Sequence, residues 1–291
     1  MDIENQPGHL FRQPFLPLWV SIPLYLLTSF VFIGVLGEIA MLSSRLLPES
    51  DAVYYAIGKE FAFALATLLG AWGAAVLFLK YVDFCPVSEL GMSIGGRWKD
   101  CLAGLLLAVV LYLVGFTISL ALGGIEIVSV KPDAGVLAAT FCVFFVAAAM
   151  EEVTLRGYIQ GRLMAKMNKF RALIIASLIF SVMHIFNSGI GFLPLLNLFL
   201  AGLMLGASYM YTRNLWFPII LHTAWNWIQG SILGYEVSGT RLSPSVITIR
   251  LSEENIVNGG AFGFEGSIIC TFLLLAATTL IVWWYERRNK A

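Results

Sequence analysis

Charged residues are scarce in this sequence. Only 12% of its 291 residues are Asp, Glu, Lys or Arg, about half the fraction of an ordinary soluble domain. The 18 basic and 18 acidic side chains cancel, so the chain lacks the basic field that nucleic-acid binding requires. Runs of like charge are missing and 59% of the residues are hydrophobic, which excludes a disordered chain. A mean hydropathy of +0.83 indicates an integral membrane protein.

Two other signals are also missing. The four cysteines show neither paired spacing nor a CxxC motif, so we interpret them as small core residues rather than a disulfide framework. The N-terminal segment contains acidic residues and prolines but no basic stretch and no small-residue cleavage site. We therefore expect that segment to be retained rather than removed as a signal peptide.

Long apolar runs, in contrast, are abundant. Eight of them approach the length of about 20 residues that a membrane-spanning helix needs. Eight such helices use about 160 residues and leave no room for a soluble catalytic domain, so any chemistry must occur inside the helix bundle or at its rim. The sequence therefore predicts an all-α, polytopic membrane protein with a single membrane domain, 1–291. The predicted spans are 17–42, 60–80, 101–122, 134–155, 171–186, 192–211, 215–234 and 266–285.

The basic residues predict the topology of these spans. With eight spans, both termini lie on the same side as the connections after the second, fourth and sixth spans. That side carries 13 of the 18 Lys and Arg residues. Because an excess of basic residues marks the cytoplasmic face, we expect both termini to be cytoplasmic.

The connection between the last two spans, 235–265, is the longest. Its stretch SVITIRL alternates in the manner of a short strand, which predicts a strand and leaves a hairpin lid open. Within the sixth span, Gly202 and Gly206 form a small-xxx-small face, which favours close packing of helices inside the bundle.

Three ionisable residues lie at the end of the fourth span. Such side chains cost a few kcal/mol each inside a membrane, so each needs a partner or a function. Glu152 and Arg156 are four residues apart and share a helix face on which they can pair. The adjacent Glu151 points about 100° away and stays free of that pair. Two interfacial glutamates with an ordinary ion pair are the alternative interpretation.

Histidine and asparagine side chains occur in two later spans. His184 follows Phe180 by four residues, and His222 precedes Asn226 by four, so each pair shares one helix face. Hydrogen bonds between helices would explain either pair without any function. With the flanking arginines as cytoplasmic anchors, however, Glu151, His184 and His222 lie about 16, 20 and 14 Å into the membrane. A carboxylate and two imidazoles at one depth predict a functional site.

These residues form three motifs that follow one another in order within the spans. The set resembles the CPBP family of intramembrane proteases, which includes the type II CAAX endopeptidases and the bacteriocin-immunity-type proteins. The resemblance implies that spans four to seven, residues 134–234, are the catalytic core, and that about eight helices enclose an intramembrane cavity. It also implies hydrolysis of a peptide bond of a membrane-associated or lipid-modified protein, reached from the cytoplasmic side. The motifs are Glu151-Glu152-x-x-x-Arg156, Phe180-x-x-x-His184 and His222-x-x-x-Asn226.

The resemblance implies a role for each motif residue. Glu151 would activate the attacking water with His184 as its partner, and His222 and Asn226 would bind the oxyanion. The chemistry is sound in itself, because a carboxylate beside an imidazole can take a proton from water. An imidazole and a carboxamide one turn apart supply two donors to one point, as a developing oxyanion requires. The supporting residues, which would hold the helices and tune Glu151, are Glu152, Arg156 and Phe180.

Zinc is an alternative cofactor that the sequence leaves open. Glu151, His184 and His222 would equally supply the three protein ligands of a catalytic zinc ion. Proteins of this family are often called metalloproteases although their need for a metal is unsettled, and the chain contains no HExxH motif.

Other functions stay open beside the protease. A proton-coupled transporter could use the same residues as a proton relay, although neither internal repeats nor pairs of broken helices are evident. A non-catalytic immunity or scaffold protein could share the fold. Ser208, in a GxSx pattern, would suit a serine protease but leaves Glu151 and His184 unexplained.

The substrate is likewise open. The expected partners are membrane lipid and a protein or peptide substrate, which is a prenylated CAAX protein if the family's name applies. The expected location is the plasma membrane of a prokaryote, where roles in peptide maturation, immunity or signalling are favoured over CAAX processing. No nucleic-acid partner is expected.

Overall fold

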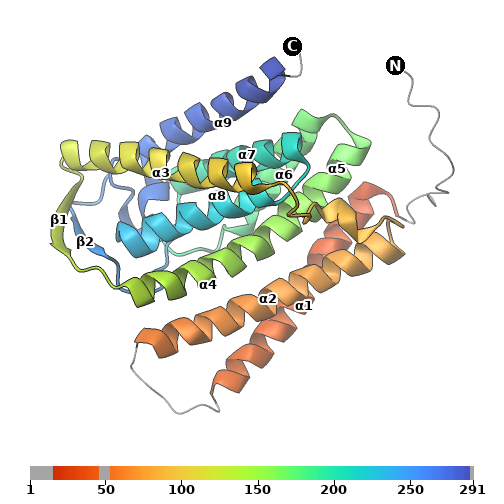
Figure 1. The fold of residues 1–291 in the computed structure, drawn as a ribbon, viewed down its shortest axis with the longest axis horizontal. Coiled ribbons are helices and arrows are strands. Elements are labelled where there is room, and N and C mark those ends of the chain that lie inside the picture. Colours follow the sequence, from red (N-terminus) through yellow and green to blue (C-terminus); the bar gives the residue numbers. More distant parts are fainter. Residues whose placement is uncertain (1–15, 46–52, 289–291) are drawn as a thin grey trace.

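The computed structural model describes residues 16–45 and 53–288 of the chain. These residues form a bundle of helices with one small two-stranded sheet at one end (Figure 1). Helices lie at all eight positions that the apolar runs predicted, which confirms an all-α polytopic protein. The helices and strands are α1 Leu18–Ser44, α2 Val53–Tyr81, α3 Trp98–Ala121, β1 Ile125–Val130, α4 Ala134–Glu152, α5 Gly161–Lys166, α6 Lys169–Met183, α7 Phe192–Thr212, α8 Trp216–Trp227, β2 Ile247–Leu251 and α9 Ile268–Arg288.

The count of eight spans is not confirmed. Six helices are long and apolar enough to cross a membrane, among them the continuous helical stretch Ala134–Lys166 that contains α4 and α5. The two that fall short are α6, with 15 residues, and α8, with 12. A helix of 15 residues rises only about 22 Å, less than the hydrocarbon core of a bilayer. α6 ends directly before His184, whereas α8 contains His222 and Asn226.

Two stretches of the bundle are wound as π-helix. Val153–Gln160 joins α4 to α5, and Ile228–Ile232 extends α8. Every residue of the first stretch is buried, including Arg156 and Gln160. Short π-helical stretches are rare and occur mostly at functional sites. The sequence pattern did not predict them, because hydrophobic periodicity does not distinguish a locally widened turn from an α-helical one.

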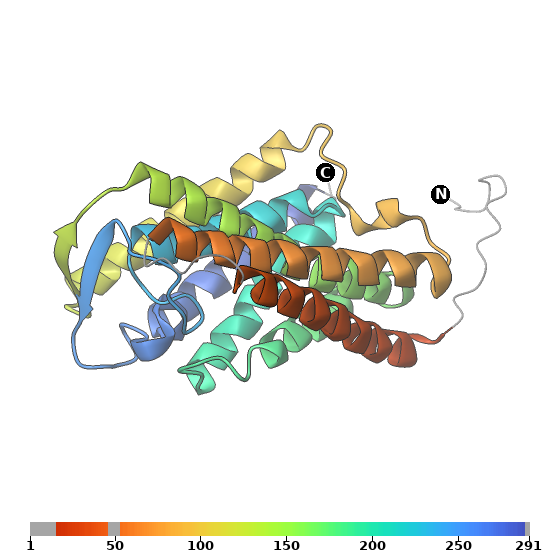
Figure 2. The ribbon, with the colours of Figure 1, turned by 90° about the horizontal axis from the view of Figure 1, so that it is seen from below.

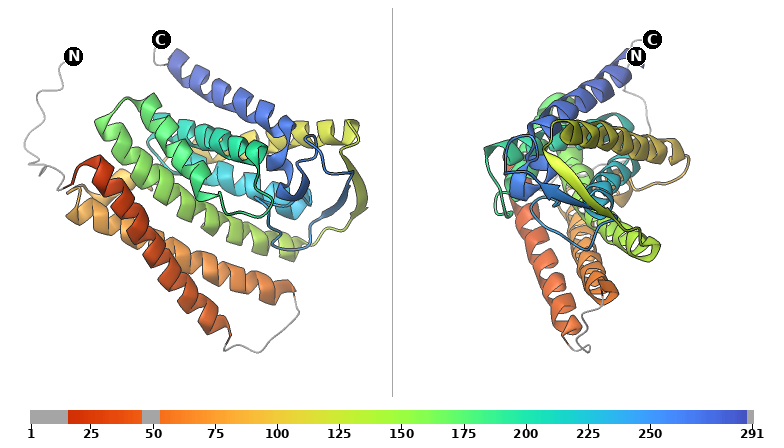
Figure 3. Two further views of the ribbon diagram at one scale, coloured as in Figure 1. Left: turned by 180° about the vertical axis from the view of Figure 1, so that it is seen from behind. Right: turned by 90° about the vertical axis from the view of Figure 1, so that its left-hand side faces the viewer.

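The helices are arranged in layers around α4, α7 and α8. α1 packs on α2 and α2 packs on α4, while α8 lies between α3 and α4. On the opposite side, α9 packs on α7, so the α1–α2 pair and α9 flank the core from two sides (Figures 1 and 3). Many large apolar side chains on α1 and α3 face outward, for example Phe30 and Leu113. An outward apolar surface is what contact with lipid requires.

The connections divide between the two ends of the bundle (Figures 1 and 2). α1 begins and α9 ends at one end, together with the α2–α3, α5–α6 and α7–α8 connections, as the basic residues predicted. The sheet and the 235–265 segment lie at the other end. The chain termini lie outside the described residues, and the cytoplasmic orientation stays a prediction.

The predicted strand near residue 247 is confirmed, and it pairs with a remote segment and not within a local hairpin. β2 pairs antiparallel with β1, so that Ile125 lies opposite Leu251 and Val130 opposite Ile247. The strand at residues 125–130 was not predicted. Their alternation of apolar and polar side chains could have revealed the strand, but the pairing joins segments more than 100 residues apart.

Candidate active site

The predicted ion pair of Glu152 and Arg156 is present and fully buried. Arg156 Nη1 donates to Glu152 Oε1 at 2.8 Å, and the side chains are 1% and 0% exposed. The guanidinium also lies 4.6 Å from the centre of the Phe180 ring and donates to the carbonyl of Gly202 at 3.4 Å. These contacts join α4 and its π-helical extension to α6 and α7. The pair therefore fixes the backbone on which Glu151 stands.

His222 of α8 contacts this pair, which the sequence did not predict. Its Nδ1 lies 2.8 Å from Glu152 Oε1. A carboxylate accepts hydrogen bonds, so Nδ1 carries a proton and Nε2 is left for other partners. The sequence assigned His222 only to Asn226, because spacing within a helix reveals neighbours on that helix and not on others.

Glu151 and His184 face one another, as predicted from their depth. His184 Nε2 lies 3.9 Å from Glu151 Oε2, and that oxygen has no hydrogen-bond partner among the described residues. His184 Nδ1 is 2.8 Å from the carbonyl of Phe180. Since a carbonyl only accepts, a proton lies on Nδ1, and in the neutral ring Nε2 presents its lone pair to Glu151. Glu151 and His184 thus offer two acceptors separated by about the width of a water-bridged contact.

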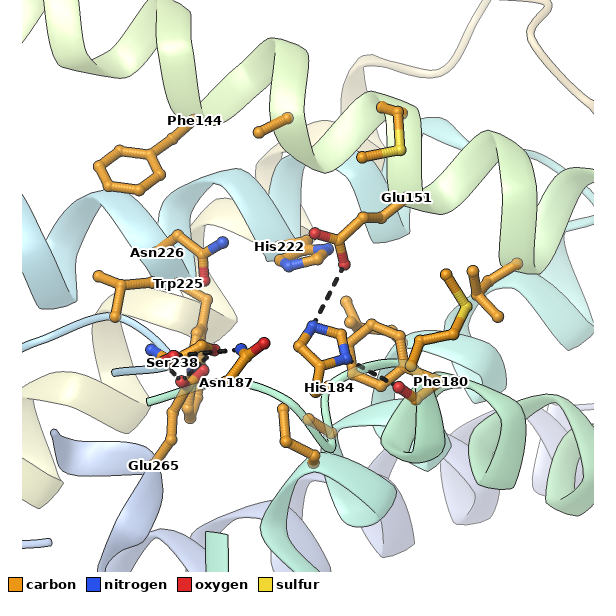
Figure 4. A pocket seen from close by; sticks show the side chains of 18 of the residues that line it. Phe144, Glu151, Phe180, His184, Asn187, His222, Trp225, Asn226, Ser238 and Glu265 are labelled. Atoms are coloured by element: carbon orange, nitrogen blue, oxygen red, sulfur yellow. Dashed lines mark hydrogen bonds and ion pairs between the residues drawn. The ribbon is translucent and has the colours of Figure 1, made fainter. Parts of the chain in front are cut away.

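A cavity of about 360 Å³ joins these groups (Figure 4). Of the predicted residues, Glu151, Phe180, His184, His222 and Asn226 line it, whereas Glu152 and Arg156 lie behind its wall. Figure 4 shows Glu151 and His184 pointing toward one another across it, with His222 and Asn226 on a neighbouring helix. The four predicted catalytic side chains therefore share one cavity, and the two supporting charges do not reach it.

The structure adds a second carboxylate that sequence reasoning missed. Glu265 lines the same cavity and is only 7% exposed. Its Oε1 accepts from Trp225 Nε1 at 2.9 Å, and its Oε2 accepts from the backbone N–H and the hydroxyl of Ser238 at 2.9 and 2.8 Å. Asn187 in turn donates to the carbonyl of Ser238 at 3.1 Å. The signal that could have identified Glu265 in the sequence is its position shortly before the apolar run of the last predicted span.

The Ser208 alternative receives no support from the geometry. Ser208 is fully buried, and its hydroxyl donates to the carbonyl of Leu205 at 2.7 Å. It is not among the residues that line the cavity with His222. The hydroxyl is therefore occupied within its own helix.

A zinc site would use the donor set that the sequence suggested, Glu151, His184 and His222. In residues 16–45 and 53–288, no group of three His, Cys, Asp or Glu side chains is arranged to hold a metal ion. One imidazole nitrogen of His222 is committed to Glu152, and one of His184 to a carbonyl. The other ring nitrogen, Nε2, stays available on both histidines, as it does in metal-binding histidines whose second nitrogen donates to a carboxylate or carbonyl. Zinc therefore stays a prediction.

Comparison with known proteins agrees with the motifs. Residues 133–228, about a third of the chain, match the family described as "Type II CAAX prenyl endopeptidase Rce1-like". No curated protein matches the chain. The matched segment contains all seven motif residues, while the extent of the predicted core, 134–234, stays a prediction. Residues 133–228 thus carry the signature of the Rce1-like type II CAAX prenyl endopeptidases, a family of membrane proteases, as the motifs predicted.

Proposed function

We propose that this protein hydrolyses a peptide bond of a membrane-associated substrate with a water molecule that Glu151 and His184 activate. The observation that carries the proposal is the pair of acceptors in the cavity, Glu151 Oε2 and His184 Nε2, 3.9 Å apart. A water molecule placed between them can donate one hydrogen to each. Its oxygen lone pair is then free to attack a carbonyl carbon.

The proton balance follows from this placement. Glu151 takes a proton as the water oxygen bonds to the carbonyl carbon, and the carbonyl oxygen becomes an oxyanion. The protonated Glu151 then delivers that proton to the leaving nitrogen as the C–N bond breaks. Water is consumed, an amine and a carboxylic acid are formed, and Glu151 returns to its starting state.

The oxyanion is bound by His222 and Asn226 in this proposal. Because His222 Nδ1 already donates to Glu152, Nε2 can donate only when the ring is protonated on both nitrogens. The Glu152 carboxylate favours that cation, and Asn226 supplies a second, neutral donor. Preorganised donors of this kind typically contribute about 3–4 kcal/mol each to stabilising the transition state.

Glu152 and Arg156 act through His222 and through the backbone rather than on the substrate. Neither lines the cavity. Arg156 contacts the Gly202 carbonyl and the Phe180 ring, and Glu152 contacts Arg156 and His222. They are positioning residues: Glu152 orients the His222 ring, and Arg156 offsets the charge of Glu152.

The substrate and its route are also proposals. The family name points to a prenylated protein, which would be presented from the membrane, and the basic residues favour entry from the cytoplasmic side. Zinc remains a prediction that measurement can decide: activity that survives a chelator in metal-free protein would argue for the metal-independent mechanism.

The test uses purified protein in liposomes with a prenylated CAAX peptide and a panel of membrane-anchored peptides. Glu151→Gln and His184→Asn are expected to lower cleavage at least about 100-fold, since each removes one of the two groups that activate water. Glu126→Gln is the matched control, because Glu126 is exposed and lies on β1 away from the cavity. Cleavage by Glu151→Gln at the wild-type rate would refute the proposal.

A further inference from the structure

Among the described residues, the cavity wall carries carboxylates but neither lysine nor arginine. Two carboxylates line it, Glu151 on α4 and Glu265 just before α9, and Figure 4 shows them toward opposite ends. The basic groups among the described residues that line the cavity are the imidazoles of His184 and His222, which Figure 4 shows beside Glu151. Arg241 of the 235–265 segment does not line the cavity, and it donates to Glu236 Oε1 at 2.9 Å and to the carbonyl of Gly234. The cavity therefore has an acidic wall at the Glu265 end.

Glu265 is held firmly in this position. Its backbone carbonyl accepts from Asn197 Nδ2 at 2.7 Å, and its carboxylate accepts from Trp225 and Ser238. Gly263, two residues earlier, has a left-handed backbone with φ of 85° and packs against the carbonyl of Glu236, where a side chain would collide. The carboxylate cannot swing away to bulk water without breaking these contacts.

The partners of Glu265 do not neutralise it. Trp225 Nε1, the Ser238 amide and the Ser238 hydroxyl are all uncharged donors. An ionised group in a poorly hydrated site is costly unless an opposite charge approaches it. A cation entering at the Glu265 end would supply that charge, whereas an anion there would be repelled by the Glu265 carboxylate. The wall thus discriminates by charge before any chemistry occurs.

We propose that Glu265 forms a subsite for a positively charged group of the substrate, a Lys or Arg side chain close to the cleaved bond. The inference rests on the proposed proteolytic function and names the substrate class for that same site. It also means that a peptide whose free terminal carboxylate must enter the Glu265 end is a poor substrate. Such a preference would set this chain apart from what the name of its family implies.

The first experiment compares matched peptides in liposomes. Peptides with Lys, Gln or Glu at each position flanking the cleaved bond are cleaved by wild-type protein and by Glu265→Gln. At one of these positions, wild-type kcat/KM is expected to be about tenfold higher for Lys than for Gln and lower still for Glu, mainly through KM. A terminal amide should likewise be preferred over a terminal carboxylate. In Glu265→Gln the Lys and Glu peptides should come within about twofold of each other.

A control variant distinguishes charge recognition by Glu265 from a purely structural role of its hydrogen bonds. Ser238→Ala removes one hydrogen bond from Glu265 but leaves its charge, so the preference for Lys should persist. If Glu265→Gln lowers cleavage of all peptides by the same factor, Glu265 only holds the 235–265 segment in place, and the inference is wrong. Equal wild-type cleavage of Lys and Glu peptides at every position would overturn it as well.

A binding measurement keeps the inference distinct from the catalytic proposal. Fluorescently labelled peptides are titrated onto Glu151→Gln protein and onto the double variant Glu151→Gln/Glu265→Gln. Tighter binding of the Lys peptide that disappears in the double variant supports the subsite even if the wild-type protein cleaves nothing. Binding that does not depend on peptide charge refutes the subsite even if cleavage is observed.

Discussion

Removing the charge of Glu152 and removing that of Arg156 should lower the free energy of unfolding by different amounts, because only Glu152 also contacts His222. Glu152→Gln leaves the Arg156 guanidinium buried with uncharged partners, which are the new amide oxygen, the Gly202 carbonyl and the Phe180 ring. Arg156→Met leaves Glu152 buried, but His222 Nδ1 still donates to it. Loss of the carboxylate should therefore be the more costly change.

The magnitudes follow from the geometry. At 2.8 Å and an effective dielectric constant of 20, the attraction between Arg156 and Glu152 is about 6 kcal/mol, which offsets the cost of burying both charges. Breaking a buried pair on one side typically costs about 3–5 kcal/mol, the value expected for Glu152→Gln. For Arg156→Met we expect about 1–3 kcal/mol, since a hydrogen-bonded partner remains. The double variant should cost at least about 2 kcal/mol less than the sum, because no unpaired charge is left.

The assay is denaturant unfolding of the four proteins in one detergent, followed by tryptophan fluorescence. The control is the same cycle on the exposed pair of Arg250 and Glu126, which are 3.3 Å apart and 67% and 68% exposed. That pair should show a coupling below about 1 kcal/mol. Additive costs at Glu152 and Arg156, or equal costs for the two single changes, would refute this account.

Three further predictions concern the helices around the cavity. Ser208→Ala should leave cleavage within about twofold of wild type, because this hydroxyl only bonds the carbonyl of Leu205; loss of cleavage would revive the serine mechanism. Gly202→Val should lower the unfolding free energy by about 1–3 kcal/mol, since a Cβ at Gly202 would lie 2.9 Å from the Cα of Ser177 on α6; an unchanged unfolding curve would contradict the close approach of α6 and α7. Burial raises the pKa of Asp83, which follows α2 and accepts a hydrogen bond from Tyr158 at 2.8 Å. A carboxyl whose pKa is higher in the folded state binds more protons there, so its contribution to stability is lost as the pH rises through that pKa. Asp83→Asn should remove this decline in a comparison of unfolding between about pH 4 and 7, and an unaltered decline would show that Asp83 is not its source.

Much of the site could be predicted from the chain alone because the membrane makes polar residues conspicuous. Glu151, His184 and His222 stand out in apolar runs where ionisable groups are costly, and their depth placed them together. Helical periodicity also predicted that Glu152 pairs with Arg156 while Glu151 stays free, and both are confirmed. These are local inferences, since residues four apart on one helix meet whatever else surrounds them.

Other parts of the site could not be predicted from spacing. Contact between His222 and Glu152 depends on how α8 packs against α4, which no pattern within either helix specifies. β1 was missed because its partner is remote along the chain.

The sequence by itself determined that this is a multi-pass helical membrane protein and which few polar side chains it keeps among its apolar spans. Hydrophobicity and periodicity suffice for that, because each acts over one helix at a time. Only the tertiary structure decided which of those side chains face the cavity, that Glu152 and Arg156 lie behind its wall, and that Glu265 lines it at the end away from Glu151. Those outcomes depend on packing and hydrogen bonds between segments far apart in the chain, and such contacts exist only once the helices have assembled.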